Sequence, residues 1–134
     1  MKILAVDTAT SVAGAAIAEE DRLLAVSCLD VGRTHSEQFL PMLQSMLKTA
    51  NLTLQDMDAY AITVGPGSFT GLRIGMATVK AFYHAHPLPI APVLTLDALA
   101  YQGRGLADVI CPCLDARKNE VYYRLYNGAG APLS

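Results

Sequence analysis

The chain has 134 residues, of which 52% are hydrophobic and 16% charged, and its formal net charge is −2 at pH 7. This length supports one domain-sized core, and the absence of a basic block argues against electrostatic capture of RNA or DNA by this chain alone. No apolar run reaches the ~18 residues of a membrane-spanning helix, and the apolar start is too short for a secretion signal. We therefore expect a cytoplasmic protein without membrane segments, and the apolar excess predicts a surface that a partner covers.

The predicted elements alternate between strands and helices. Short apolar runs bounded by turn residues predict strands at 2–7, 12–18, 22–30, 59–64 and 90–93. The capping-box pattern Thr34-x-x-Glu37 predicts a helix to residue 50, after which 53–57 forms one helical turn. Further helices are expected at 71–86 and 95–101, the latter capped by Thr95, followed by strands at 109–115 and 120–126. This order predicts an α/β fold with a mixed sheet and flanking helices.

The three cysteines favour a reducing compartment. Cys111 and Cys113 flank Pro112, and this spacing is neither the C-x-x-C redox motif nor half of a recognisable zinc site. Cys28 lies in another apolar segment. We expect all three to be small apolar side chains on buried strands.

A glycine-rich turn joins a strand to the longest predicted helix, in the segment 64–75. Its glycines permit backbone angles or close approaches that side chains forbid, and a helix start presents unpaired N–H groups at the positive end of the helix dipole. Gly65, Gly67 and Ser68 are therefore candidates for holding an anion. The alternative, a tight structural turn, stays open, because the segment matches neither the P-loop nor the Rossmann fingerprint.

A second candidate loop follows the first strand. Asp7 ends that strand, and Thr8 and Thr10 lie in the turn behind it. This arrangement is similar to the first phosphate loop of actin-like and sugar-kinase-like proteins, in which hydroxyls approach phosphate oxygens and the carboxylate positions a metal ion or water. In the alternative, Asp7 only accepts backbone hydrogen bonds within the turn.

Four segments together resemble one family. The blocks 3–10, 33–37, 65–75 and 115–122 are similar, in order and spacing, to the TsaB (YeaZ-like) proteins of bacteria. The segment Gly-Pro-Gly-Ser-Phe-Thr-Gly-Leu-Arg-Ile-Gly is the most specific of the four. The resemblance covers nearly the whole chain.

The resemblance implies an actin-like/Hsp70-like (ASKHA) fold of two ribonuclease-H-like lobes. It assigns residues 1–102 to the first lobe and residues 103–134 to the opening strands of the second. Members of the family are considerably longer, so we expect the second lobe to be truncated here and any nucleotide site between the lobes to be incomplete.

The functional implication is a scaffold and activator subunit for N6-threonylcarbamoyladenosine at position 37 of ANN-decoding tRNAs. The implied partners are a TsaD-like transferase, a TsaE-like ATPase within the same complex, and a second copy of the chain when it is alone, with tRNA contacted only indirectly. ATP is used by the complex. For this chain we expect no cofactor beyond weak nucleotide binding at the loops, whose candidate residues are Asp7, Thr8, Thr10, Gly65, Gly67 and Ser68.

No catalytic or metal-ligating residue is predicted. The pair His84 and His86 faces different sides of a helix, unlike the H-x-x-x-H pair of the TsaD-like partner, and His35 stands alone. Two alternatives remain: an ATP-binding or ATP-hydrolysing actin-like enzyme, and the M22-type glycoprotease of an older family label. No nucleophile–base pair in the sequence supports the second.

Apolar stripes on two helices predict the partner interface. With a TsaD-like subunit or a second copy, two such helices would form a four-helix bundle, into which Gly71 and Gly75 admit a close neighbour. In the alternative, both stripes cover the sheet. The candidate interface residues are Phe39, Leu43, Met46, Leu47, Gly71, Leu72, Gly75, Met76 and Val79.

Overall fold

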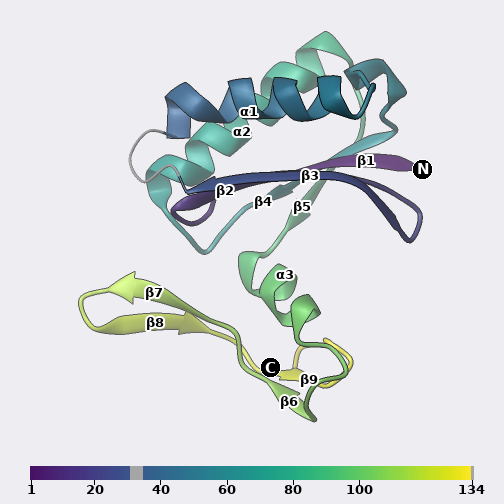
Figure 1. Ribbon diagram of the computed structural model, residues 1–134. Helices are drawn as coiled ribbons and strands as arrows, with labels where there is room; N and C mark the ends of the chain where they lie inside the picture. Colours follow the sequence, from purple (N-terminus) through teal and green to yellow (C-terminus); the bar gives the residue numbers. More distant parts are fainter. Residues whose placement is uncertain (31–34, 134) are drawn as a thin grey trace.

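The computed structural model describes residues 1–30 and 35–133, without the side chains of residues 35 and 36. Its main layer is a five-stranded sheet in the order β3-β2-β1-β4-β5 (Figure 1). The first three strands pair antiparallel, whereas β4 runs parallel to both β1 and β5. The strands are β1 (Lys2–Asp7), β2 (Val12–Glu19), β3 (Arg22–Asp30), β4 (Ala59–Thr63) and β5 (Ile90–Val93). The predicted α/β class with a mixed sheet is confirmed.

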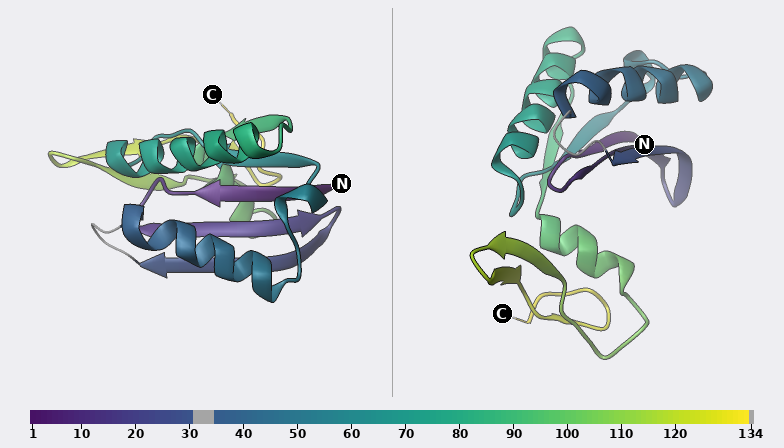
Figure 2. Two further views of the ribbon diagram at one scale, coloured as in Figure 1. Left: turned by 90° about the horizontal axis from the view of Figure 1, so that it is seen from above. Right: turned by 60° about the vertical axis from the view of Figure 1, so that its left-hand side comes forward.

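Two long helices cover one face of this sheet. The helices α1 (His35–Thr49) and α2 (Phe69–Ala85) lie on the same side of the sheet, and in the left view of Figure 2 both run roughly along the strands. The single turn η1 (Leu54–Asp56) follows α1. The predicted cap at Thr34 lies outside the described residues. None of the described helices is long and apolar enough to cross a membrane.

Alternating side-chain size decides which face of the sheet holds the core. Leu4 pairs with Tyr60 and Val6 pairs with Ile62 across β1 and β4, and all four side chains are buried beneath the helices. Between them, Ala5 pairs with Ala61 and points to the opposite face. Large residues therefore meet α1 and α2, and small residues line the other side. The helices contribute Phe39, Met42, Leu43, Met46, Val79 and Phe82 to this core.

A second, smaller cluster forms below the sheet. It contains α3 (Thr95–Gln102), the pair β6 (Val109–Ile110) and β9 (Tyr126–Asn127), and the hairpin of β7 (Cys113–Arg117) and β8 (Glu120–Tyr123) (Figure 1). Tyr126 is fully buried against Leu96 and Ala100, and its hydroxyl donates to Asp97. Burial and this hydrogen bond raise the pKa of Tyr126 above its usual value. The predicted boundary after residue 102 stays a prediction, but α3 packs with the segment that follows it.

Four local predictions are wrong. Pro112 interrupts the predicted strand 109–115, which forms β6 and β7 instead, and the predicted strand 120–126 divides into β8 and β9. Leu94, not Thr95, is the N-cap of α3, and the hydroxyl of Thr95 is buried without a hydrogen-bond partner. All three cysteines are exposed rather than buried.

Candidate functional site

Two loops of the sheet and the β7–β8 hairpin enclose a cleft of about 690 Å³, here called the loop cleft. One wall comes from the β1–β2 turn and from the start of α2. The opposite wall comes from the hairpin. The lining residues are Ala9, Thr10, Ser11, Gly67, Ser68, Phe69 and Thr70 on the first wall, and Leu114, Asp115, Ala116, Arg117 and Tyr122 on the second.

The glycine-rich turn is fixed against the β1–β2 turn. Gly65 has φ = 112°, a conformation that favours glycine. A Cβ on Gly67 would lie 2.5 Å from the carbonyl oxygen of Ala9, so only glycine allows this approach. The next amide, Ser68 N–H, donates to that oxygen at 2.7 Å. The two loops therefore form one rigid wall.

The start of α2 makes this wall favourable for an anion. Ser68 is the N-cap, and its hydroxyl accepts from the amide of Gly71 at 3.2 Å. The first residues of the helix, Phe69 and Thr70, line the cleft, and early helix N–H groups have no partner within the helix. The positive end of the dipole of this 17-residue helix thus lies at the loop cleft.

The hairpin adds charge from the other side. Arg117 and Asp115 both line the cleft, and the Asp115 carboxylate accepts from the backbone amide of Arg117 at 2.7 Å. Arg117, Lys118 and Asn119 all have positive φ, between 54° and 66°, which turns the chain sharply at the tip. A guanidinium and a helix N-terminus can together bind a carboxylate or phosphate.

Three of the six predicted nucleotide-loop residues line this cleft and three do not. Thr10, Gly67 and Ser68 are in its wall. Asp7 accepts instead from Thr63 Oγ1 at 2.8 Å and from the amide of Ala9 at 3.0 Å, which makes it a turn residue. Thr8 is fully buried and donates to the carbonyl of Gly71 at 2.7 Å.

The carbonyl of Gly65 accepts from the amide of Thr95 at 2.9 Å, so this residue connects the turn to α3. Sequence reasoning missed Ser11, Phe69, Thr70, Arg117 and Tyr122. The block 115–122 carried the family resemblance, but nothing local to it predicted that it faces the glycine-rich turn.

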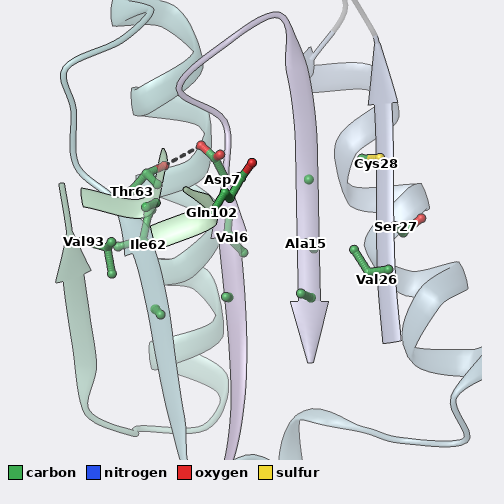
Figure 3. Close-up of a pocket in the computed structure, with 15 residues that line it drawn as sticks. Val6, Asp7, Ala15, Val26, Ser27, Cys28, Ile62, Thr63, Val93 and Gln102 are labelled. Carbon is green, nitrogen blue, oxygen red and sulfur yellow. Dashed lines mark hydrogen bonds between the residues drawn. The ribbon is translucent and has the colours of Figure 1, made fainter. Parts of the chain in front are cut away.

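Asp7 belongs to a different pocket, on the face of the sheet away from α1 and α2. This pocket, of about 390 Å³, is lined mainly by small side chains of all five strands of the sheet together with Ala98 and Gln102 of α3. In Figure 3 the Asp7 carboxylate points towards Thr63, and Gln102 lies nearby. Its walls are apolar apart from these few groups, in contrast to the loop cleft.

The candidate interface residues fall into two groups. Six are buried in the core or against the β1–β2 turn: Phe39, Leu43, Met46, Gly71, Gly75 and Val79. These six residues are therefore not accessible in the described chain, because one stripe of each helix covers the sheet, and their place in a partner interface stays a prediction. Leu47, Leu72 and Met76 keep partial exposure. Among the described side chains of α1 and α2, the large apolar ones that are exposed are Leu40, Phe69 and Tyr83.

Among the described side chains, the histidines and acidic residues do not form a cluster. His84 is exposed on α2, and His86 caps the end of that helix. Within the ranges 1–30 and 35–133, no group of three or more His, Cys, Asp or Glu side chains is placed to hold a metal ion.

Comparison with known proteins agrees with this architecture. A family model described as TsaD, tRNA N6-adenosine threonylcarbamoyltransferase, matches residues 29–133. The chain is 36% identical to the tRNA threonylcarbamoyladenosine biosynthesis protein TsaB of Bacillus subtilis over 94% of this chain and 55% of that protein. It therefore spans about half the length of the curated relatives that it matches.

Solved structures give the same result. YeaZ from Pseudomonas aeruginosa superimposes with a TM-score of 0.84 at 34% identity, over 94% of this chain and 60% of that one. The activator of 2-hydroxyisocaproyl-CoA dehydratase from Clostridium difficile, solved with bound ADPNP, has a TM-score of 0.58 at 13% identity over 100% of this chain and 44% of that one, which shows a shared ASKHA-type fold. From the sheet order, the glycine-rich turn and these matches, the chain belongs to the TsaB (YeaZ-like) family.

Proposed function

We propose that this chain acts in the formation of N6-threonylcarbamoyladenosine in ANN-decoding tRNAs, as a scaffold subunit that binds a TsaD-like transferase and activates it. The observation that carries the proposal is the similarity, over 94% of this chain, to the B. subtilis protein named for this biosynthesis. In this proposal the transferase and a TsaE-like ATPase supply the chemistry and the use of ATP. In this proposal the tRNA is bound by other subunits of the complex and not directly by this chain.

The test is reconstitution of the modification. A TsaD-like transferase, a TsaE-like ATPase, a threonylcarbamoyl donor and an ANN-decoding tRNA transcript are combined with and without this chain, and the nucleosides are quantified by mass spectrometry. We expect the modified nucleoside to increase when the chain is added. The full-length B. subtilis relative is the positive control. If the relative stimulates the reaction and this chain does not, the proposal fails for this chain.

The outer surface of α1 and α2 is the proposed binding surface. The buried apolar stripes of α1 and α2 pack against the sheet. A partner helix can therefore pack only on the side of these helices that faces away from the sheet. Leu40 is 44% exposed and Tyr83 45% exposed, which makes them the largest apolar contacts available on the two helices besides Phe69. A second copy of the chain would use the same surface in a homodimer.

Charge on this surface should weaken association without unfolding the protein. We expect Leu40→Glu and Tyr83→Glu each to reduce binding of the transferase at least tenfold, because each places a carboxylate in an apolar contact. Surface plasmon resonance measures the loss, and sedimentation velocity follows the homodimer. Gln55→Glu, exposed on η1 and outside both helices, is the matched control. Unchanged affinity in both helix variants, with native circular dichroism, would rule out this surface.

The loop cleft favours nucleotide binding as a second candidate function. The start of α2, Thr10 and Arg117 surround a polar cleft, and one protein of the same fold was solved with a bound nucleotide analogue. We expect ATP binding by calorimetry to fall about tenfold in Arg117→Ala, which removes the cation, and to be unaffected in Lys48→Ala, an exposed cation at the far end of α1. Equal affinities would exclude the loop cleft as the phosphate site.

A further inference from the structure

Two exposed thiols lie together where the chain passes from β6 into the β7–β8 hairpin. Cys111 and Cys113 are separated only by Pro112, and their Sγ atoms are 3.9 Å apart. Both residues are exposed, and the Cys113 thiol also donates to the backbone carbonyl of Cys111 at 3.6 Å. The two side chains thus lie on the same side of the backbone.

This geometry is close to that of a disulfide. A disulfide bond is about 2.05 Å long, so each sulfur has to move by only about 1 Å to form it. Both residues are exposed, which leaves room for this movement. Pro112 has a fixed φ angle and so restricts the backbone between the two cysteines. Less conformational entropy is therefore lost when the disulfide closes the loop.

We propose that Cys111 and Cys113 form a reversible dithiol–disulfide site, which is oxidised by hydroperoxides and reduced again by cellular dithiols. In the first step, a thiolate of the pair attacks a peroxide oxygen and becomes a sulfenic acid, and hydroxide leaves. In the second step, the other sulfur attacks the sulfenyl sulfur, the S–S bond forms, and water leaves. Two thiols and one hydrogen peroxide thereby give one disulfide and two waters, and a dithiol such as reduced thioredoxin reverses the reaction by exchange.

The two sulfurs are not equivalent. Desolvation and the hydrogen bond with Cys113 raise the pKa of the Cys111 thiol above its usual value. Because the thiolate is the nucleophile, whichever sulfur has lost its proton attacks the peroxide, and the other sulfur then resolves the sulfenic acid. Oxidation should therefore accelerate as the pH rises towards the thiol range.

The disulfide would act on the loop cleft. The pair lies at the base of the hairpin whose residues Asp115, Arg117 and Tyr122 form one wall of that cleft. Closing a small ring at Pro112 fixes the angle at which the chain enters β7.

Cys28 provides an internal control, because it is the third exposed cysteine and has no thiol beside it among the described residues. The protein is treated with a small excess of hydrogen peroxide, its remaining thiols are alkylated, and tryptic peptides are analysed by mass spectrometry. Peptide 105–117 contains both Cys111 and Cys113. We expect it to lose two hydrogen masses and to take up no alkylating agent, while Cys28 stays alkylated. Dithiothreitol should restore both thiols.

The reduced pair has a separate signature. Phenylarsine oxide bridges two adjacent thiols, so it should protect Cys111 and Cys113, but not Cys28, from alkylation. In Cys111→Ser the same peroxide treatment should leave Cys113 as a sulfenic acid that dimedone captures, and Cys28→Ser should behave as the unaltered protein. The proposal is wrong if peptide 105–117 remains fully alkylated after peroxide, or if its loss of thiols comes only from disulfides between molecules.

Discussion

Replacement of Gly71 by alanine is expected to destabilise the protein by about 3 kcal/mol, although helix propensity alone favours the change by up to about 1 kcal/mol. A Cβ at this position would overlap the backbone carbonyl of Thr8, which is fully buried. The Thr8 hydroxyl also donates to the Gly71 carbonyl, so the two segments cannot separate without losing a hydrogen bond. Urea denaturation should show the midpoint falling by about 1–3 M.

The matched control is Ala77→Gly, an exposed position on the same helix. At this position only helix propensity changes, and we expect the free energy of unfolding to fall by about 1 kcal/mol. If packing against Thr8 were unimportant, Gly71→Ala would stabilise the protein and the two changes would have opposite signs. A gain in stability for Gly71→Ala would therefore contradict the described contact between α2 and the β1–β2 turn.

Leu43→Ala should lower the free energy of unfolding by about 2–5 kcal/mol. The Leu43 side chain is only 1% exposed and lies in the core between α1 and the sheet. Thermal and urea unfolding measure this loss. The neighbouring Leu40, three residues earlier on the same helix, is 44% exposed, and Leu40→Ala should change stability by no more than about 0.5 kcal/mol.

The same pair separates packing from association. Leu43→Ala should weaken partner binding only to the extent that it unfolds the chain, whereas Leu40→Glu should weaken binding in a fully folded protein. Similar losses of stability for Leu40→Ala and Leu43→Ala would mean that α1 is rotated about its axis relative to the described structure.

The sequence predicted the layers of the fold because the signals for them are local. Strand β5 and strand β1 have the predicted bounds, and α1 and α2 differ from prediction by one or two residues at their ends. The errors occurred where a single residue overrides a pattern. Pro112 has no N–H to donate and breaks an otherwise continuous apolar run, and Thr95, a good capping residue, lies one position inside α3.

The site was harder to predict because it depends on distant segments. The glycine-rich turn was recognised, but its partners on the hairpin lie about fifty residues later, and no local pattern of Arg117 or Tyr122 indicates what they face. An amphipathic stripe has a similar ambiguity. The spacing of Phe39, Leu43 and Met46 predicts a buried face, but it does not say whether a sheet or another protein buries it.

Leu94 is the covalent link between the sheet and the cluster built on Tyr126. On either side of it, β5 pairs with the sheet and α3 packs with β6 and β9, while the Thr95 amide ties the same point to the Gly65 carbonyl at 2.9 Å. Both the loop cleft and the pocket beside Asp7 take walls from each side of this link. A rotation about Leu94 would thus act as a hinge that changes the widths of the two cavities together, and a ligand in either one would be coupled mechanically to the other.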